Sequence, residues 1–197
     1  MRRVTRESTL AWIVWRWWFW ALAVAILFAQ PLVRTLLREK PVLPPVGAAV
    51  PAFEALRETG QPFGTRELGG RVWVASFVVA DEADDTLEIL RKLQRRLRHM
   101  GDSYRMVSFA AIPDQDDVAR LAALARRAHA NPRAWCFVTG TTLAPVAAAL
   151  HVALGARPDP TLILIDQHGH IRWQYDPRNP AEVDSLVATL GLVVNAY

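Results

Sequence analysis

Apolar residues follow two different periods along the second half of the chain, and these periods predict alternating strands and helices. An unbroken apolar run over 71–79, RVWVASFVV, is rich in β-branched and aromatic residues, which is typical of a strand covered on both faces. From residue 84 to residue 100, leucines recur at helical spacing with arginines on the opposite side, and Gly101 follows as a stop signal. The pattern therefore predicts a strand followed by an amphipathic helix.

The same alternation continues towards the C-terminus. Further strands are expected over 104–112, 135–139, 161–166 and 171–175, and further helices over 118–128, 142–150 and 181–190. The segment 167–170, QHGH, separates the last two strands as a hairpin turn. Strands that alternate with helices, followed by a hairpin and a closing helix, predict an α/β thioredoxin-like fold with a central sheet flanked by helices.

The N-terminal part of the chain has the pattern of a membrane anchor. The run over 17–33, WWFWALAVAILFAQPLV, carries no charge, and at about 1.5 Å per residue it is near the lower limit for spanning a bilayer core. Tryptophans crowd its N-terminal end, where indole rings prefer the headgroup level. One N-terminal transmembrane helix is therefore expected over 12–37, and a cleaved signal peptide is the alternative.

Four parts of the chain follow from these patterns. Residues 1–11 form the N-terminus and residues 12–37 form the anchor. The arginines before the span slightly outnumber the basic residues after it, which favours a cytoplasmic N-terminus. Residues 38–51 form a Pro-rich linker, because each proline in PVLPPVGAAVP fixes its own φ and biases the preceding residue away from helix. Residues 52–197 form the folded domain, and a fragment from Pro51 onward is expected to fold alone as a monomer.

Composition excludes several classes of protein. Hydrophobic residues make up 52% of the chain and charged residues 21%, so it is not a disordered tail. The net charge is +4, but 21 of the 23 basic residues are arginine, and beside so much alanine this skew indicates genomic composition rather than a nucleic-acid surface, so no nucleic-acid partner is expected. The chain has one cysteine, Cys136, which excludes a disulfide framework, a Cys-rich zinc site and an intramolecular dithiol.

From about residue 51 to residue 190, the chain resembles the Sco/SenC family, membrane-tethered thioredoxin-like copper proteins associated with cytochrome c oxidase assembly. Four segments carry the resemblance in order and spacing: LGGRVWVASF at 68–77, SFAAIPDQDD at 108–117, WCFVTG at 135–140 and TLILIDQHGHIR at 161–172. The resemblance implies a domain outside the cytoplasm, periplasmic on a single-pass protein of a bacterial inner membrane. It also implies a role in the biogenesis of a respiratory oxidase or its copper centre.

The family's metal site is missing at the matching positions. The family has a CxxxC just after the first strand of the domain and a histidine shortly before the strand that begins here at Thr161. Counting along the chain places these three ligands at Glu82, Thr86 and Pro158, and 155–160 contains no histidine. A carboxylate and a hydroxyl do not replace two thiolates for Cu(I), so no cofactor and no enzymatic activity are predicted.

Two hypotheses about function remain open. The first is a non-catalytic interaction or assembly factor with a degenerate copper and redox site, whose partners are the membrane and oxidase subunits or other assembly factors. The alternative is an active copper metallochaperone or thiol-disulfide oxidoreductase that uses His168, His170 and Cys136. Against the alternative, the two histidines are typical of a solvated turn and Cys136 of an inert thiol in a buried strand.

Overall fold

A computed structural model describes residues 18, 20–22, 24–26, 28–29, 44–79, 84–111, 118–140, 143–150 and 161–196. The chain divides into two compact units, residues 1–40 and residues 41–197. In the first unit the described residues are helical, and across the described parts of the whole chain no helix is both long and apolar enough to cross a membrane. The rest of the anchor expected over 12–37 lies outside the described residues.

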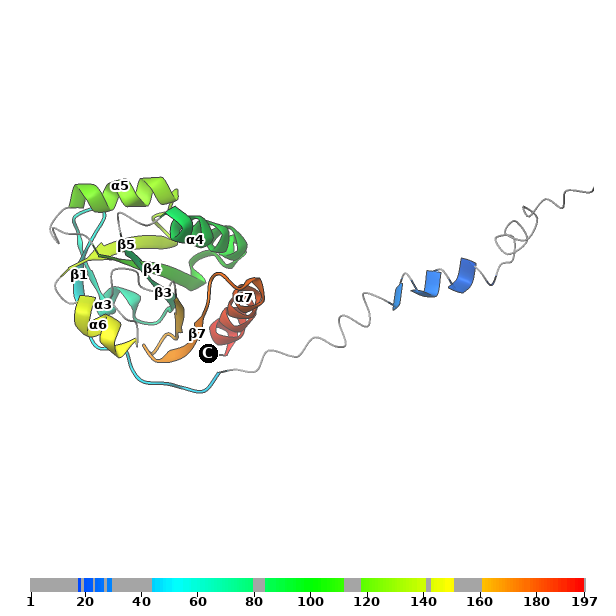
Figure 1. The fold of residues 1–197 in the computed structure, drawn as a ribbon. Helices are drawn as coiled ribbons and strands as arrows, with labels where there is room; N and C mark the ends of the chain where they lie inside the picture. The colour runs from blue at the N-terminus through cyan, green and yellow to red at the C-terminus, as the bar shows by residue number, and fades with distance from the viewer. Residues whose placement is uncertain are drawn as a thin grey trace, which may run out of the picture. The chain divides into compact units, whose positions relative to one another are not determined.

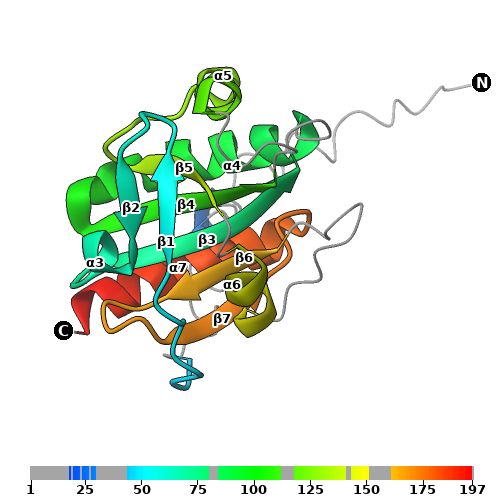
Figure 2. The ribbon, with the colours of Figure 1, turned by 90° about the vertical axis from the view of Figure 1, so that its left-hand side faces the viewer.

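The second unit is built on one seven-stranded sheet with the order β2-β1-β5-β4-β3-β6-β7 (Figures 1 and 2). Its central strands β3, β4 and β5 are parallel, and every other pairing is antiparallel. The strands are β1 (Glu54–Arg57), β2 (Pro62–Gly64), β3 (Val72–Val79), β4 (Tyr104–Ala111), β5 (Trp135–Thr139), β6 (Leu162–Ile165) and β7 (Ile171–Tyr175). The expected strands from residue 71 onward are confirmed within two residues at each end.

Helices cover both faces of the sheet, as the unbroken apolar runs predict. One face packs against α4 (Asp84–Leu97), α5 (Val118–Ala128) and α7 (Pro180–Asn195), and the other packs against α3 (Thr65–Leu68) and α6 (Leu143–Ala149). Successive residues of β3 alternate between the two cores, with Val74 in the first and Trp73 and Ala75 in the second. The α/β thioredoxin-like architecture expected from the sequence is therefore present, with α4 directly after β3.

Two helices differ in length from the sequence expectation. The expected helix over 84–100 ends at Leu97 and continues as a 3-10 segment, Arg98–Ser103, in which Gly101 adopts φ +56°. The closing helix runs to Asn195 instead of residue 190, and Asn179 caps its start by accepting a hydrogen bond from the Ala181 N–H at 3.1 Å. Helix ends are decided by local caps and packing, which apolar periodicity does not report.

The segment before β3 contains structure that the sequence analysis did not predict. Strands β1 and β2 form a short hairpin, and α3 follows it. Further upstream, residues 47–50, in the segment expected as linker, pair with the turn before β7: the Val50 N–H donates to the Gly169 carbonyl at 2.8 Å, and the Ile171 N–H donates to the Ala48 carbonyl at 3.0 Å. These elements are only three or four residues long, so they carry no detectable period.

Candidate functional site

One of the three family ligand positions, Thr86, lies in the described part of the chain. Thr86 is half-buried in the first turn of α4 and lines a narrow crevice beside Ser76 of β3 and Thr161, which precedes β6. The crevice has no room for a water molecule. Glu82 and Pro158 lie outside the described residues. The end of β3, the start of α4 and the approach to β6 therefore come together, and the hydroxyl of Thr86 lies among them.

A row of buried polar side chains crosses the sheet next to this crevice. The hydroxyls of Ser76 and Ser108 are 2.8 Å apart on adjacent strands, and the Trp135 indole N–H donates to the Ser108 Oγ at 2.8 Å. Every member of the row has a partner, and among the described residues no histidine or carboxylate is hydrogen-bonded to it. The row therefore satisfies polar groups inside the core and does not activate a nucleophile.

Cys136 lies in the middle of β5 with 2% of its surface exposed, as expected for an inert thiol. Its Sγ is 3.6 Å from the Met106 carbonyl oxygen, to which the thiol donates. Burial raises the pKa of the Cys136 thiol to about 12, and the nearby Arg57 opposes this shift without overcoming it. At neutral pH the side chain is therefore a protonated thiol, which is neither a nucleophile nor a good metal ligand.

His168 and His170 lie in the turn between β6 and β7, where the buried Asp166 organises the backbone. The Asp166 Oδ1 accepts hydrogen bonds from the N–H groups of both histidines at 2.9 Å, and its Oδ2 accepts one from the Arg172 Nε at 2.8 Å. Burial alone would raise the pKa of Asp166, but the His170 N–H and the Arg172 guanidinium outweigh it, so the pKa is lowered. The Asp166 carboxylate thus fixes the backbone of the turn through these hydrogen bonds.

The structure does not bring Cys136 together with the two histidines. Cys136 is on β5, and the turn follows β6, which is three strands away in the sheet. At about 4.8 Å between neighbouring strands, the separation is roughly 14 Å or more. Among the described residues, no three His, Cys, Asp or Glu side chains are placed to hold one metal ion together. The three candidate residues of the alternative hypothesis therefore do not form a single site.

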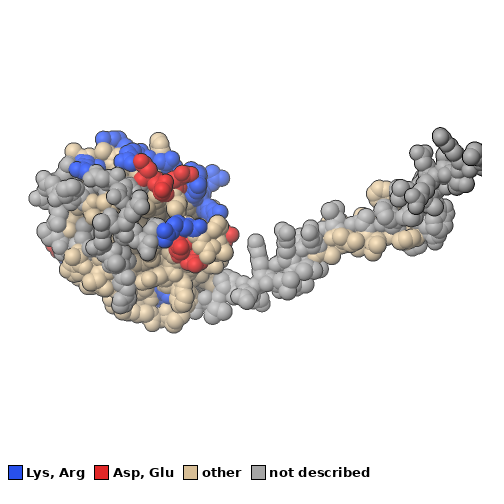
Figure 3. Space-filling view, viewed as in Figure 1, with Lys and Arg blue, Asp and Glu red and all other residues tan. Residues whose placement is uncertain are grey.

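The arginines of α4 lie opposite its leucine stripe, as the sequence predicts, and mix with acidic side chains on the molecular surface (Figure 3). Arg96 pairs with Asp184 of α7, and Arg127 of α5 pairs with Asp84. Arg91 is half-buried instead, and its Nη2 donates to the Arg127 carbonyl at 2.7 Å. Arg91 therefore joins α4 to the end of α5, a role that helical spacing does not reveal.

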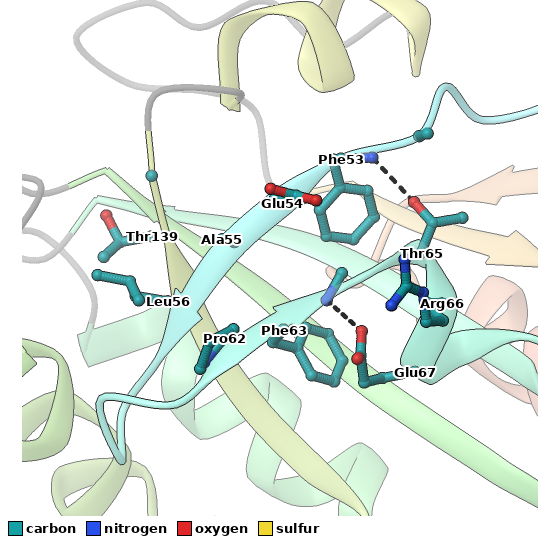
Figure 4. Close-up of a pocket in the computed structure, with 13 residues that line it drawn as sticks. Phe53, Glu54, Ala55, Leu56, Pro62, Phe63, Thr65, Arg66, Glu67 and Thr139 are labelled. Carbon is teal, nitrogen blue, oxygen red and sulfur yellow. Dashed lines mark hydrogen bonds between the residues drawn. The ribbon is translucent and has the colours of Figure 1, made fainter.

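A cavity of about 860 Å³ opens along the β1–β2 hairpin, beside the end of β5 (Figure 4). Thr139 and Leu56, which are register partners, lie at one end of it, and Arg66 and Glu67 lie at the other. The Thr139 Oγ1 is buried and has no hydrogen-bond partner among the described residues. Apolar side chains of the hairpin line the cavity together with the charged Glu54, Arg66 and Glu67 and the hydroxyls of Thr65 and Thr139. The sequence analysis missed the cavity because β1 and β2 were not predicted.

Comparison with known proteins gives matches among solved structures alone. No protein-family model matches the chain, and no curated protein matches it. BsSco, a member of the Sco family of cytochrome c oxidase assembly proteins with a disulfide switch, superimposes with a TM-score of 0.70 at 16% identity over 79% of this chain and 99% of its own. The chain has the thioredoxin-like fold of the Sco/SenC proteins.

Two further Sco structures agree with this assignment. A SCO1/SenC family lipoprotein from Bacillus anthracis str. Ames gives a TM-score of 0.67 at 21% identity and covers 78% of this chain and 100% of its own. Bradyrhizobium japonicum ScoI, solved with copper bound, gives 0.58 at 14% identity over 74% of this chain and 99% of its own. The Sco/SenC resemblance drawn from the four sequence segments is thus confirmed for the fold, whereas the chemistry has to be argued from this chain's own residues.

Proposed function

We propose that this chain is a membrane-tethered Sco/SenC-type protein whose copper and redox site is degenerate, and that it acts as a non-catalytic interaction or assembly factor in the biogenesis of a respiratory oxidase. The Sco-type fold and the four matching segments support the family setting. The charge-free run over 17–33 supports a single-span anchor. The folded domain then lies in the periplasm, where oxidase subunits or other assembly factors are its partners.

The observation that carries the degenerate site is the placement of the thiol and hydroxyl groups. Thr86, which the count along the chain assigns to the second cysteine position, lies at the start of α4, and the chain's one cysteine is 2% exposed in β5. Cu(I) requires soft, polarisable ligands, and a disulfide requires two thiols. A hydroxyl at Thr86 and a protonated thiol at Cys136 supply neither, so copper transfer and thiol exchange are not the activity of this domain.

Copper binding tests this proposal directly. The full chain in mild detergent competes with a Cu(I) chelator, and we expect it to take up no more copper than its Cys136→Ser variant, because Cys136 is buried and protonated. Uptake of one tightly held Cu(I) per chain by the unmodified protein would contradict the degenerate site. Loss of that copper in Cys136→Ser would support the metallochaperone alternative.

A gain-of-function series tests whether the scaffold is otherwise that of a Sco protein. The change Glu82→Cys with Thr86→Cys and Pro158→His restores two thiolates four residues apart and an imidazole, so we expect tight Cu(I) binding and a reversible disulfide. Asp159→His replaces Pro158→His in a parallel variant, because a one-residue loop shift moves the histidine position. Failure of both variants to bind copper would show that these positions do not match the family site.

The oxidase setting has its own test. The tagged full chain, crosslinked in the membrane and purified, is expected to recover an oxidase subunit or an oxidase assembly factor above an anchor-only control made from residues 1–43. The control separates capture by the domain from capture by the shared membrane. Reproducible recovery of partners unrelated to the oxidase would contradict the proposed role in oxidase biogenesis, but it would still support a role as an interaction factor.

A further inference from the structure

Three arginines from separate parts of the chain point to one face of the sheet: Arg71 and Arg105 lie at the N-terminal ends of β3 and β4, and Arg57 lies at the C-terminal end of the antiparallel strand β1. Arg105 of β4 is the register partner of Trp73, and Arg71 precedes Trp73 by two residues, so the two arginine side chains point to the same face of neighbouring strands. Arg57 ends β1 opposite Val138, which packs in the core on that same face. All three side chains are half-buried.

Hydrogen bonds bring two of these guanidinium groups close together. The Arg57 Nη2 donates to the Pro132 carbonyl at 3.4 Å, and the Arg105 Nη1 donates to the carbonyl of the next residue, Arg133. The Arg57 guanidinium also lies over the Phe63 ring, 5.6 Å from its centroid. The Arg57 and Arg105 guanidinium groups therefore bind successive carbonyls just before β5, and Arg71 lies next to Arg105 because β3 and β4 are neighbouring strands. Arg105 is the middle member, since β5 and β4 separate β1 from β3.

The nearby acids do not balance this cluster of Arg57, Arg71 and Arg105. The Glu58 Oε1 accepts a hydrogen bond from the Arg57 Nη2 at 3.1 Å, and its Oε2 is occupied by the Phe137 N–H at 3.0 Å. Burial, followed by repulsion from Arg71, lowers the pKa of Arg105, with a smaller repulsion from Arg57 and a weak opposing attraction from Asp102. In the part of the chain that the structure describes, Glu58 and Asp102 thus face three guanidinium groups, which leaves the cluster with a net positive charge.

Two nitrogen atoms of the cluster are buried without any hydrogen-bond partner among the described residues, the Arg57 Nε and the Arg71 Nη1. A buried, uncompensated charged group is costly, and the cost falls when a counter-charge binds beside it. The guanidinium fork matches the oxygen pairs of phosphate and sulfate, and several guanidinium groups around one point favour an anion that carries more than one charge.

We infer that the cluster of Arg57, Arg71 and Arg105 is a binding site for a small phosphate-class oxyanion. The site is separate from the family copper position, because Arg71 and Arg105 lie at the N-terminal ends of β3 and β4 and Thr86 follows the C-terminal end of β3. The eight residues of β3 span roughly 26 Å at about 3.3 Å per residue. The inference therefore holds whether or not the proposed function is correct.

Thermal unfolding of the full chain in detergent tests the site with inorganic phosphate as the probe. We expect a saturable rise in Tm of about 2–5 °C in millimolar phosphate relative to chloride at equal ionic strength, because an anion that binds only the folded state stabilises it. Arg71→Gln is expected to abolish the rise and to leave the Tm in chloride equal or higher, since it removes a buried unpartnered group. Arg95→Gln, an exposed site on α4, is the charge-matched control and keeps the rise.

A second variant keeps the test decisive if Arg71→Gln does not fold. Arg105→Lys preserves the charge and removes the guanidinium fork, and we expect the apparent affinity for phosphate to fall about tenfold. The inference is overturned if phosphate shifts the Tm no more than chloride does. It is equally overturned if Arg95→Gln reduces the phosphate effect as much as the cluster variants do.

Discussion

Asp166 is the residue on which the β6–β7 turn depends. Asp166 is 1% exposed, and its carboxylate accepts hydrogen bonds from two backbone N–H groups of the turn. It also pairs with the Nε of Arg172, a residue that is buried as well. Arg172 in turn donates through its Nη1 to the Pro44 carbonyl at 3.2 Å. A single buried ion pair thus holds both the hairpin turn and the chain that enters the domain.

Removing the Asp166 charge is expected to destabilise the domain strongly. Asp166→Asn leaves the Arg172 guanidinium buried without its counter-charge, which costs about 3–5 kcal/mol in the free energy of unfolding. Urea denaturation at pH 7 measures the loss. Asp184→Asn is the matched control, because its side chain is 71% exposed in a surface ion pair, and it should change the free energy of unfolding by less than about 1 kcal/mol.

The same carboxylate predicts an acid limit of stability. The folded pKa of Asp166 lies below its unfolded pKa, so its contribution is fully present above the unfolded pKa, near 4, and is lost as the pH falls through the lowered folded pKa. The free energy of unfolding, followed from pH 6 down to pH 2, should therefore fall less steeply for Asp166→Asn than for the unmodified chain. Parallel curves for the two proteins would contradict the lowered pKa.

Cys136 should resist thiol reagents in the native state. Its pKa of about 12 leaves almost no thiolate at pH 8, and the β5 backbone and the surrounding core exclude the reagent. Labelling by an aromatic disulfide reagent is expected to be slow in buffer and complete within the mixing time in denaturant. Fast native labelling of one thiol per chain would place Cys136 at the surface and contradict its position in β5.

At the scale of elements, the contact between the β1–β2 hairpin and α3 depends on Gly64. A Cβ at Gly64 would lie 2.2 Å from the Phe53 carbonyl oxygen, and the Gly64 N–H donates to the Glu67 Oε2 at 2.8 Å at the start of α3. Backbone atoms cannot yield as a flexible side chain can, so a methyl group here pushes the end of β2 away from Phe53 and the start of β1. This close approach fixes the floor of the cavity in Figure 4.

Two glycine substitutions of the same size should therefore have opposite effects. Gly64→Ala is expected to lower the free energy of unfolding by about 1–3 kcal/mol through overpacking. Gly191→Ala, inside α7 where an added Cβ meets nothing within 4 Å, is expected to raise it by about 0.5–1 kcal/mol through helix propensity. Chemical denaturation of the two variants compares them, and a neutral Gly64→Ala would mean that the hairpin is not held against α3.

At the scale of the whole molecule, residues 44–50 belong structurally to the folded domain. Besides the bonds of Ala48 and Val50, the Gly47 N–H donates to the Ile171 carbonyl at 2.8 Å, and Val50 is buried at 8% exposure in the core beside α6. In the chain as we interpret it, these residues connect the anchor to the edge strand β7. Residues 44–50 are therefore fixed to the β6–β7 turn and to β7 by backbone hydrogen bonds and by the burial of Val50.

Truncation tests this attachment. A fragment from Pro51 onward should fold, because all seven strands and every core residue except Val50 lie after it. It should be less stable than a fragment from Pro41 onward by about 2–4 kcal/mol, since it loses four hydrogen bonds and the Val50 packing. Urea midpoints of the two fragments give the difference. Equal midpoints would show that residues 44–50 contribute nothing to the domain.

The sequence by itself determined the central layers of this protein. Long apolar runs such as 71–79 and the leucine stripe of 84–97 carry enough period to locate β3 and α4, and four segments in the right order identify the Sco-type fold. The composition also decides part of the chemistry, because a chain with one cysteine cannot form an internal disulfide. The sequence alone also shows that residue 86 is a threonine, which has no thiol.

Tertiary structure alone decided which distant residues meet. Strands of three or four residues such as β1 and β2 have no period, so their pairing and the cavity they line follow only from the folded sheet. The same holds for the buried Thr139 hydroxyl, which has no hydrogen-bond partner within the described ranges. The cluster of Arg57, Arg71 and Arg105 cannot be predicted from local patterns for the same reason, because Arg57 ends β1, Arg71 precedes β3 and Arg105 lies in β4. Register and strand order, which place side chains on a common face, are long-range properties that local patterning does not encode.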